Sequence, residues 1–195
     1  MSTIADNISQ VSARIAAAAL QAQREPSQVG LLAVSKTKPA TAIREAFAAG
    51  VRDFGENYLQ EALSKQEELV GLPLFWHFIG PIQSNKTRAI AEHFAWVHSV
   101  DRLKIAQRLS EQRPSTLAPL NVCIQVNVSG EASKSGCAPD DVHTLATAIA
   151  ALPNLHVRGL MAIPEPTDDP VAQDAAFARV RTLQHDLQLP LDTLS

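Results

Sequence analysis

The sequence predicts an α/β fold built on a parallel sheet, and specifically a (β/α)8 barrel of the TIM type. Short apolar runs alternate with amphipathic segments along the chain, and no hairpin dipeptide joins two of the runs. This alternation is typical of parallel strands connected by helices. An open doubly wound sheet is the alternative. No glycine fingerprint of the dinucleotide-binding kind follows any run, which favours the barrel.

The strands are predicted from apolar runs bounded by polar residues, proline or glycine. They cover residues 29–35, 51–57, 74–80, 94–100, 119–129 and 155–163, and residues 191–195 begin a seventh. The first run, VGLLAVS, is continuous and predicts a strand buried on both faces. The fifth run alternates, with its valines and Ile124 on one face and Cys123 and Gln125 on the other. We expect that strand to have one apolar and one polar face.

Helices are predicted between these strands, where apolar residues recur at helical spacing. The segment from Ile4 to Ile15 precedes the first strand and is expected to pack outside the sheet. Pro39 opens the next helix and Gly50 ends it, while Ser84 and Asp101 are the expected N-caps of two later helices. Further helices are expected at residues 58–70, 142–149 and 176–187, and a mobile loop at residues 129–137.

Seven strands are one fewer than a closed barrel needs, and such barrels typically need about 250 residues. The chain has 195 residues. We therefore expect a single domain over residues 1–195 that stops before the last strand and helices of a barrel. Unpaired edges on the first and seventh strands would favour instability or self-association.

The composition indicates a cytosolic globular protein. The chain is 46% hydrophobic with a formal net charge of -3, which offers no electrostatic footprint for nucleic acid. No segment reads as a signal peptide or membrane span. Cys123 and Cys137 have no metal-ligand spacing and are expected to be free thiols in a reducing, cytoplasmic compartment.

Lys36 is the strongest candidate for chemistry because it directly follows the first predicted strand. Ligands bind at the carboxyl ends of strands in both open α/β sheets and barrels. Partial burial, together with a second ammonium group at Lys38, would favour the neutral amine that attacks carbonyls to form Schiff bases. The alternative is an ordinary solvated lysine at a strand end.

Six segments resemble the pyridoxal phosphate homeostasis protein family, in the same order and over nearly all of the chain. They are LLAVSKTKP, FGENYLQE, WHFIGPIQSNK, SVDR, KSG and RGLMAI. The resemblance implies the barrel of the alanine racemase N-terminal domain without a second domain, and Lys36 as the lysine that forms a Schiff base with pyridoxal 5'-phosphate. It also implies vitamin B6 homeostasis rather than catalysis, transient contact with pyridoxal phosphate-dependent enzymes, and a monomer in the complete form. An amino acid racemase-like enzyme is the alternative.

The other site residues are proposed with a structural alternative beside each. Asn57 would hydrogen-bond the cofactor ring or cap a turn, and Glu56 beside it is an acid or base candidate on the opposite side of its strand. His77 would contact the cofactor or be a satisfied core histidine. The resemblance suggests that Met161 packs against the ring. It places Ser195 where the family's phosphate-binding segment begins.

Other chemistries find little support in the sequence. Residues 80–87, GPIQSNKT, nearly match a phosphate loop, but Asn85 replaces the second glycine and Pro81 removes an amide donor. No histidine, cysteine or carboxylate spacing predicts a metal site, and no nucleophile elbow is present. We expect no catalytic residue and no metal ligand, and we expect Asp168 and Asp169 to be solvated surface charges.

Overall fold

The computed structural model describes residues 2–130 and 135–195 and confirms the alternation of strands and helices. The helices are α1 (Ile4–Gln21), α2 (Ala40–Ala48), α3 (Leu59–Glu68), α4 (Thr87–His93), α5 (Leu103–Gln112), α6 (Val142–Ala150) and α7 (Pro170–Asp186). The strands are β1 (Ala33–Val34), β2 (Asp53–Glu56), β3 (Phe75–Phe78), β4 (Trp96–Val100), β5 (Leu120–Gln125), β6 (Leu155–Met161) and β7 (Thr193–Leu194). Residues 131–134 of the expected mobile loop lie outside the described residues.

The chain divides into two compact units, Met1–Trp76 and His77–Ser195. In the first unit β1 pairs in parallel with β2, and the N–H of Phe75 at the start of β3 donates to the carbonyl of Arg52 just before β2 at 2.8 Å. Helix α1 contacts α2. Buried apolar side chains fill this unit, among them Ile43, Phe54 and Ala62.

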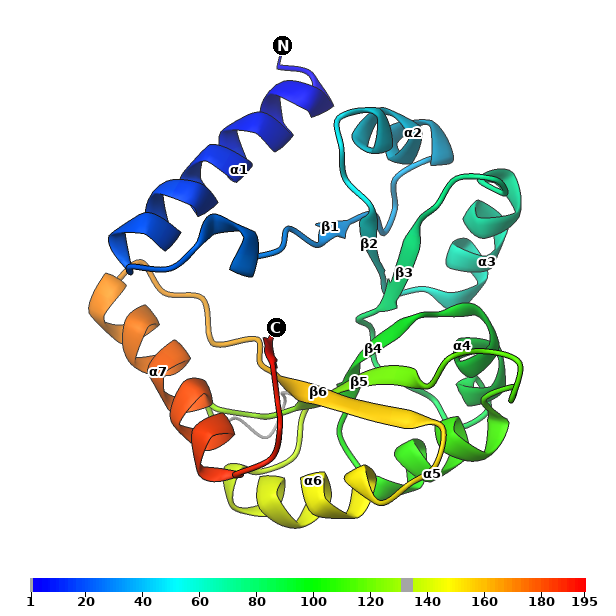
Figure 1. The fold of residues 1–195 in the computed structure, drawn as a ribbon, viewed down its shortest axis with the longest axis vertical. Coiled ribbons are helices and arrows are strands. Elements are labelled where there is room, and N and C mark those ends of the chain that lie inside the picture. The colour runs from blue at the N-terminus through cyan, green and yellow to red at the C-terminus, as the bar shows by residue number, and fades with distance from the viewer. Residues whose placement is uncertain (1, 131–134) are drawn as a thin grey trace. The chain divides into compact units, whose positions relative to one another are not determined.

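The second unit is a run of parallel strands in sequence order, with β3 paired to β4, β4 to β5, β5 to β6 and β6 to β7. Helices α4 to α7 lie outside these strands (Figure 1). The strands β4, β5 and β6 supply fully buried residues such as Val97, Ile124 and Leu160. Parallel order follows from the helical connections, because each helix returns the chain to the end of the sheet where the next strand begins.

Gly159 allows β7 to pair closely with β6. A Cβ atom at this position would lie 1.7 Å from the carbonyl oxygen of Thr193, its partner on β7. The pairing continues past β7, where the N–H of Ser195 donates to the Leu160 carbonyl at 2.9 Å and the N–H of Ala162 donates to the Ser195 carbonyl at 3.0 Å. Glycine at position 159 therefore fixes the place of Ser195 beside β6.

One expectation about the strands is wrong. The first strand is shorter than residues 29–35 and is not buried on both faces, since only Ala33 and Val34 pair with β2 and Val34 is 52% exposed. The fifth strand alternates in residue type as expected, and both of its faces contain buried side chains, with Cys123 0% and Gln125 7% exposed. Strand β5 lies between two parallel neighbours, so its polar side chains are buried as well.

The predicted helix ends are right at Gly50 and wrong at the two polar caps. Gly50 has φ 99, and the N–H groups of Gly50 and Val51 bond back to α2 as in a Schellman motif. The N-caps of α4 and α5 are Lys86 and Arg102, one or two residues after the predicted ones. The carboxylate of Asp101 instead pairs with the guanidinium of Arg102 at 2.7 Å.

Candidate functional site

Lys36 lies in a tight turn directly after β1 in the first unit. The N–H of Lys38 donates to the carbonyl of Ser35 at 3.0 Å, which closes a four-residue turn with Lys36 and Thr37 at its centre. Both Lys36 and Lys38 are exposed. The structure thus presents the Lys36 amine at the carboxyl end of β1, as predicted, but without the partial burial that the sequence suggested.

The turn is conformationally strained at Thr37. Thr37 has φ 63, a left-handed conformation that turns of this kind usually assign to glycine or asparagine. A β-branched residue in this conformation is an outlier, and it persists where surrounding contacts hold it. The residue after Lys36 is therefore held in place by its neighbours rather than by its own preference.

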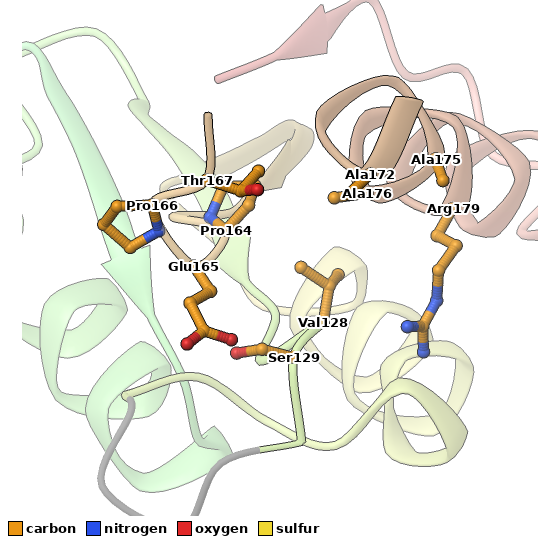
Figure 2. Close-up of a pocket in the computed structure, with 10 residues that line it drawn as sticks. All are labelled: Val128, Ser129, Pro164, Glu165, Pro166, Thr167, Ala172, Ala175, Ala176 and Arg179. Carbon is orange, nitrogen blue, oxygen red and sulfur yellow. The ribbon is translucent and has the colours of Figure 1, made fainter. Parts of the chain in front are cut away.

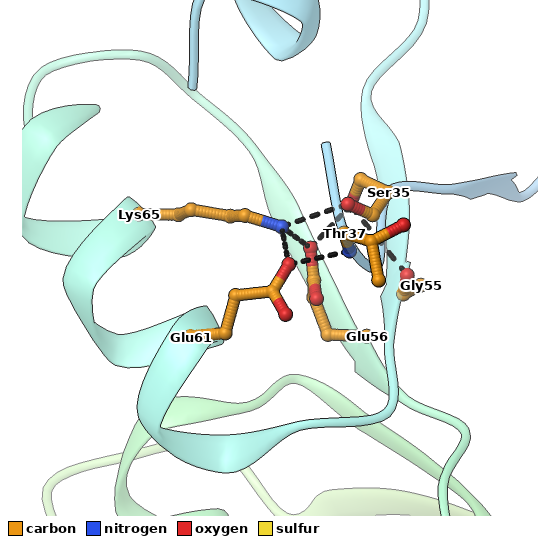
Figure 3. A network of polar contacts seen from close by, with 6 residues as sticks. All are labelled: Ser35, Thr37, Gly55, Glu56, Glu61 and Lys65. Atoms are coloured by element: carbon orange, nitrogen blue, oxygen red, sulfur yellow. Dashed lines mark hydrogen bonds and ion pairs between the residues drawn. The ribbon is translucent and has the colours of Figure 1, made fainter. Parts of the chain in front are cut away.

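Three charged side chains form an ionic cluster beside this turn, which we call the Lys65 cluster: Glu56 and Lys65, which are buried, and Glu61, whose side chain is 30% exposed (Figure 3). The Lys65 ammonium group lies 2.7 Å from Glu56 Oε1 and 2.5 Å from Glu61 Oε1. Glu56 is fully buried and Lys65 is 5% exposed. The hydrogen bond from Lys65 lowers the pKa of Glu61 below its ordinary value, so that this carboxylate is ionised at neutral pH.

The Lys65 cluster contacts the backbone on both sides of Lys36. Lys65 Nζ donates to the carbonyl of Ser35 at 2.7 Å, and Glu61 Oε1 accepts from the N–H of Thr37 at 2.6 Å. The Ser35 hydroxyl donates to Glu56 Oε1 at 2.6 Å. The acid or base role considered for Glu56 has no geometric support here, because its carboxylate is enclosed and paired with an ammonium group.

Asn57 lies at the same edge of the first unit as Lys36. In the register of β1 and β2, Val34 faces Gly55, so Lys36 and Asn57 each lie two residues beyond the last paired position. The amide oxygen Oδ1 of Asn57 is buried and has no hydrogen-bond partner among the described residues. An exposed amine and an amide oxygen that lacks a donor, at the same strand edge, fit an aldehyde ligand that also carries a hydrogen-bond donor.

In the second unit, His77 and Ser195 are joined by a residue that the sequence analysis did not single out, His98. His77 Nδ1 lies 2.9 Å from His98 Nε2, and His98 Nδ1 lies 2.7 Å from the Ser195 hydroxyl. The ring of His77 also stacks on Trp96 with 5.5 Å between ring centroids. We call His77, His98 and Ser195 the histidine chain. His77 is thus buried with polar and stacking contacts, and its contact with a cofactor stays a prediction.

The histidine chain is electrically neutral at His98. Burial first, and then the charge of a protonated His77, lowers the pKa of His98 to about 3. A neutral imidazole has one N–H and one acceptor nitrogen, so His98 donates to one neighbour and accepts from the other. The hydrogen bonds of the chain therefore run in one direction, either from His77 towards Ser195 or the reverse.

A cavity of about 540 Å³ lies where β5 and β6 are followed by their loops (Figure 2). It is lined by residues after β5, by the proline-rich loop after β6 and by one side of α7. The Glu165 carboxylate and the Ser129 hydroxyl point towards each other at its floor. Met161 ends β6 and is 6% exposed, but neither it nor any other predicted site residue lines this cavity.

The functional groups that the sequence analysis missed are Lys65, Glu61 and His98. Glu61 and Lys65 are four residues apart on α3, a spacing that indicates an ion pair on one helix face. Nothing in the sequence indicates that this face turns inward to the strand ends. Likewise, the run FAWVHSV predicts a strand but not which polar partners its histidine finds.

The cysteines carry no thiolate at neutral pH. Both are free, and burial raises the pKa of Cys123 to about 12 and that of Cys137 to about 11. Within residues 2–130 and 135–195, no group of histidine, cysteine or carboxylate side chains is arranged to hold a metal ion. In the same part of the chain, no helix has the length and apolarity needed to cross a bilayer.

Comparison with known proteins gives the class of the fold. Residues 4–195 match the family model described as alanine racemase, N-terminal domain. The α/β fold with parallel strands is accordingly that of the alanine-racemase-type barrel domain. The predicted fold class is confirmed.

Individual relatives define the family more narrowly. The pyridoxal phosphate homeostasis protein of Pseudomonas aeruginosa is 75% identical over 195 residues, covering 100% of this chain and 85% of that protein. That of Vibrio cholerae is 56% identical, covering 100% of this chain and 86% of the relative. The structure of PipY from Synechococcus elongatus PCC7942 with PLP bound is 41% identical with a TM-score of 0.80, covering 92% of this chain and 87% of that one. The chain belongs to the pyridoxal phosphate homeostasis protein family, as its sequence motifs predict.

Proposed function

We propose that this protein binds pyridoxal 5'-phosphate reversibly through Lys36 and acts in the intracellular homeostasis of that cofactor. The observation that carries the proposal is the exposed Lys36 amine, held in a strained turn at the carboxyl end of β1. When bound, the cofactor supplies an aldehyde, whose carbon bonds to Lys36 Nζ as water leaves. Membership of the family and the PLP-bound structure of PipY support the same ligand.

The remaining contacts are predictions at the level of single residues. Asn57 would accept a hydrogen bond from the cofactor, because its buried amide oxygen lacks a donor. The resemblance to the family assigns cofactor contacts to His77, Met161 and Ser195. Each of these three assignments stays a prediction, and Ser195 would contribute through a hydroxyl whose orientation is set by His98.

We propose binding and release rather than catalysis as the activity. A two-base racemase needs an acid or base on each face of the reacting carbon. The two exposed amines after β1, Lys36 and Lys38, belong to one turn, and the nearby carboxylate of Glu56 is enclosed by Ser35 and Lys65. Transient contact with pyridoxal phosphate-dependent enzymes, a monomeric state of the complete protein and a cytoplasmic location complete the proposal. The free cysteines suit that compartment.

The test is a visible absorption titration with pyridoxal 5'-phosphate, followed by borohydride reduction and peptide mapping. We expect a new absorption band and a reduced adduct on Lys36 that are both absent from Lys36→Ala. Lys38→Ala is the matched control, since it removes an exposed amine two residues away, and it should keep the adduct on Lys36. An unchanged band in Lys36→Ala would overturn the proposal. Loss of α-proton label from amino acids by the loaded protein would favour a racemase-like enzyme instead.

A further inference from the structure

The strand end that carries Lys36 is bound to α3 through backbone groups rather than through the lysine itself. The Ser35 carbonyl belongs to the peptide bond that precedes Lys36, and the Thr37 N–H belongs to the one that follows it. Lys65 Nζ donates a hydrogen bond to the Ser35 carbonyl, and Glu61 Oε1 accepts one from the Thr37 N–H (Figure 3). Both peptide planes next to Lys36 are therefore fixed by side chains of one helix.

The contacts are stronger than ordinary backbone hydrogen bonds. Each involves an ionised side chain, and such hydrogen bonds are shorter and about twice as strong as those between neutral groups. Lys65 is held in turn by both carboxylates, and Glu56 is anchored on β2. The turn cannot shift without disturbing a buried ion pair, whose partners would be left uncompensated.

A fixed backbone matters for an amine on a long side chain. The lysine side chain has several freely rotating bonds, and a mobile turn would add backbone freedom to be lost when the amine is bonded to a ligand. Holding a reacting group in place before reaction lowers that cost. The strain at Thr37 shows that the turn is not the backbone's own preference.

We propose that Glu56, Glu61 and Lys65 are positioning residues that fix the turn carrying Lys36 and thereby strengthen its reversible bond to an aldehyde ligand. This inference rests on the proposed function and adds to it three residues that do not themselves touch the ligand. Glu61 contacts the residue after Lys36, Lys65 contacts the residue before it, and Glu56 holds the Lys65 ammonium group in place.

The test compares Glu61→Ala with Glu61→Gln. Alanine removes the acceptor for the Thr37 N–H, whereas glutamine keeps an amide oxygen that can accept the same hydrogen bond. In the cofactor-free protein, we expect amide hydrogen exchange at Thr37 to be faster in Glu61→Ala and close to wild type in Glu61→Gln. In titrations with pyridoxal 5'-phosphate, we expect Glu61→Ala to bind about tenfold more weakly, the order of magnitude set by ordering one backbone residue, with substantial rescue in Glu61→Gln.

Arg44→Ala is the matched control, since this α2 residue contacts the same helix, α3, away from Lys36. Its guanidinium donates to the carbonyl of Glu68 at the other end of α3, at 2.6 Å, and does not flank Lys36. This variant should lower the melting temperature slightly and leave both Thr37 exchange and ligand binding unchanged. Equal weakening of binding in Arg44→Ala and Glu61→Ala would overturn the inference, since a general loss of stability would then explain both.

A double variant tests the other side of the turn. Glu56→Leu together with Lys65→Met removes the donor to Ser35 without leaving a buried charge unpaired. It should weaken binding of pyridoxal 5'-phosphate by a similar factor, and wild-type binding would count against the inference.

Lys36→Ala separates a failure of the proposed function from a failure of the positioning role. If it binds as well as wild type, the proposed function fails, whereas wild-type binding by Glu61→Ala alone refutes only the positioning role.

Discussion

The Lys65 cluster and the histidine chain are both polar networks with buried members, but they contact their predicted site residues in different ways. The cluster consists of ionised groups that hold backbone atoms on either side of Lys36. The chain is neutral at His98, whose ring contacts a side-chain hydroxyl, that of Ser195. One network fixes where a residue is, and the other fixes which way a hydroxyl group points.

The two networks differ because the hydrogen-bond partners available to Lys65 differ from those available to His98. Lys65 finds three oxygen acceptors, two of them on carboxylates, which offset the cost of burying its ammonium group. His98 faces another histidine and a hydroxyl, neither of which compensates a positive charge, and it therefore stays neutral. Buried groups keep their charge only where acceptors of opposite charge surround them. The two networks should accordingly respond differently to mutation and to pH.

The largest expected effect comes from breaking the ionic network on one side. Lys65→Met leaves the fully buried Glu56 without its counter-ion and should destabilise the protein by about 3–5 kcal/mol. Adding Glu56→Leu should recover much of that loss, because both charges are then removed together. Urea unfolding of the two variants measures the difference. A single variant as stable as wild type would show that Glu56 is not held as an ion.

Gly159→Ala should disturb the pairing of β6 with β7, which places Ser195 of the histidine chain. Its new Cβ would collide with the Thr193 carbonyl and push β7 away from β6, at a cost of about 1–3 kcal/mol. Ser195, which bonds to β6 beyond that contact, should lose its place next to His98. Thermal melts and the NMR signals of the His98 ring report the two effects. Gly30→Ala is the control, since no heavy atom lies within 4 Å of its added Cβ.

The pH dependence of stability should separate the two networks. His98 has a pKa of about 3 in the folded protein against 6.5 when unfolded. The unfolded state therefore binds the extra proton first, and stability falls as the pH drops below 6.5. Between pH 7 and pH 5 the loss from this one group should be at most about 2 kcal/mol. Glu61, whose pKa is lowered by Lys65, should cost stability only at lower pH, as the pH falls through and below 4.5.

Unfolding measurements at several pH values check this order. His98→Gln removes the titrating ring and should flatten the stability profile between pH 7 and pH 5. Glu61→Gln should leave that range unchanged and flatten the profile at lower pH. The same slope in wild type and His98→Gln between pH 7 and pH 5 would contradict the neutral state of His98.

The smallest effect concerns the strain beside Lys36. Thr37→Gly should relieve the left-handed conformation but increase the freedom of the unfolded chain, for a net stabilisation within about 1 kcal/mol. Because the backbone N–H of residue 37 can still donate to Glu61, amide hydrogen exchange at residue 37 should stay close to wild type. Urea unfolding and hydrogen exchange at residue 37 check this prediction, and a clear destabilisation would show that the Thr37 side chain itself holds the turn.

Much of the fold was predictable from local patterns. The apolar runs and helical spacings place every strand and helix in order, and Gly50 marks the end of α2. The polar caps at Ser84 and Asp101 were wrong, because a single capping residue is a weak signal when charged neighbours offer other contacts. That residues 1–195 form one domain stays a prediction.

The candidate site was predictable in part. Lys36 and Asn57 follow neighbouring strands, so their common edge could be expected from the alternation alone. The burial of Lys65 could not, because a Glu61–Lys65 pair four residues apart looks the same on a solvated helix face. His98 was hidden for a similar reason, since a histidine within an apolar strand has no partner visible in the sequence.

The sequence by itself determined the order of elements, the parallel strands, the family and the lysine at the end of the first strand, because each of these depends on local spacing or on motifs. Only the tertiary structure decided what holds that lysine in place. In the folded protein α3 is oriented so that Lys65 and Glu61 contact the peptide groups beside Lys36, and His98 lies between His77 and Ser195. Contacts between residues far apart in the chain depend on how packed helices and strands face one another, and a local sequence pattern does not predict that orientation.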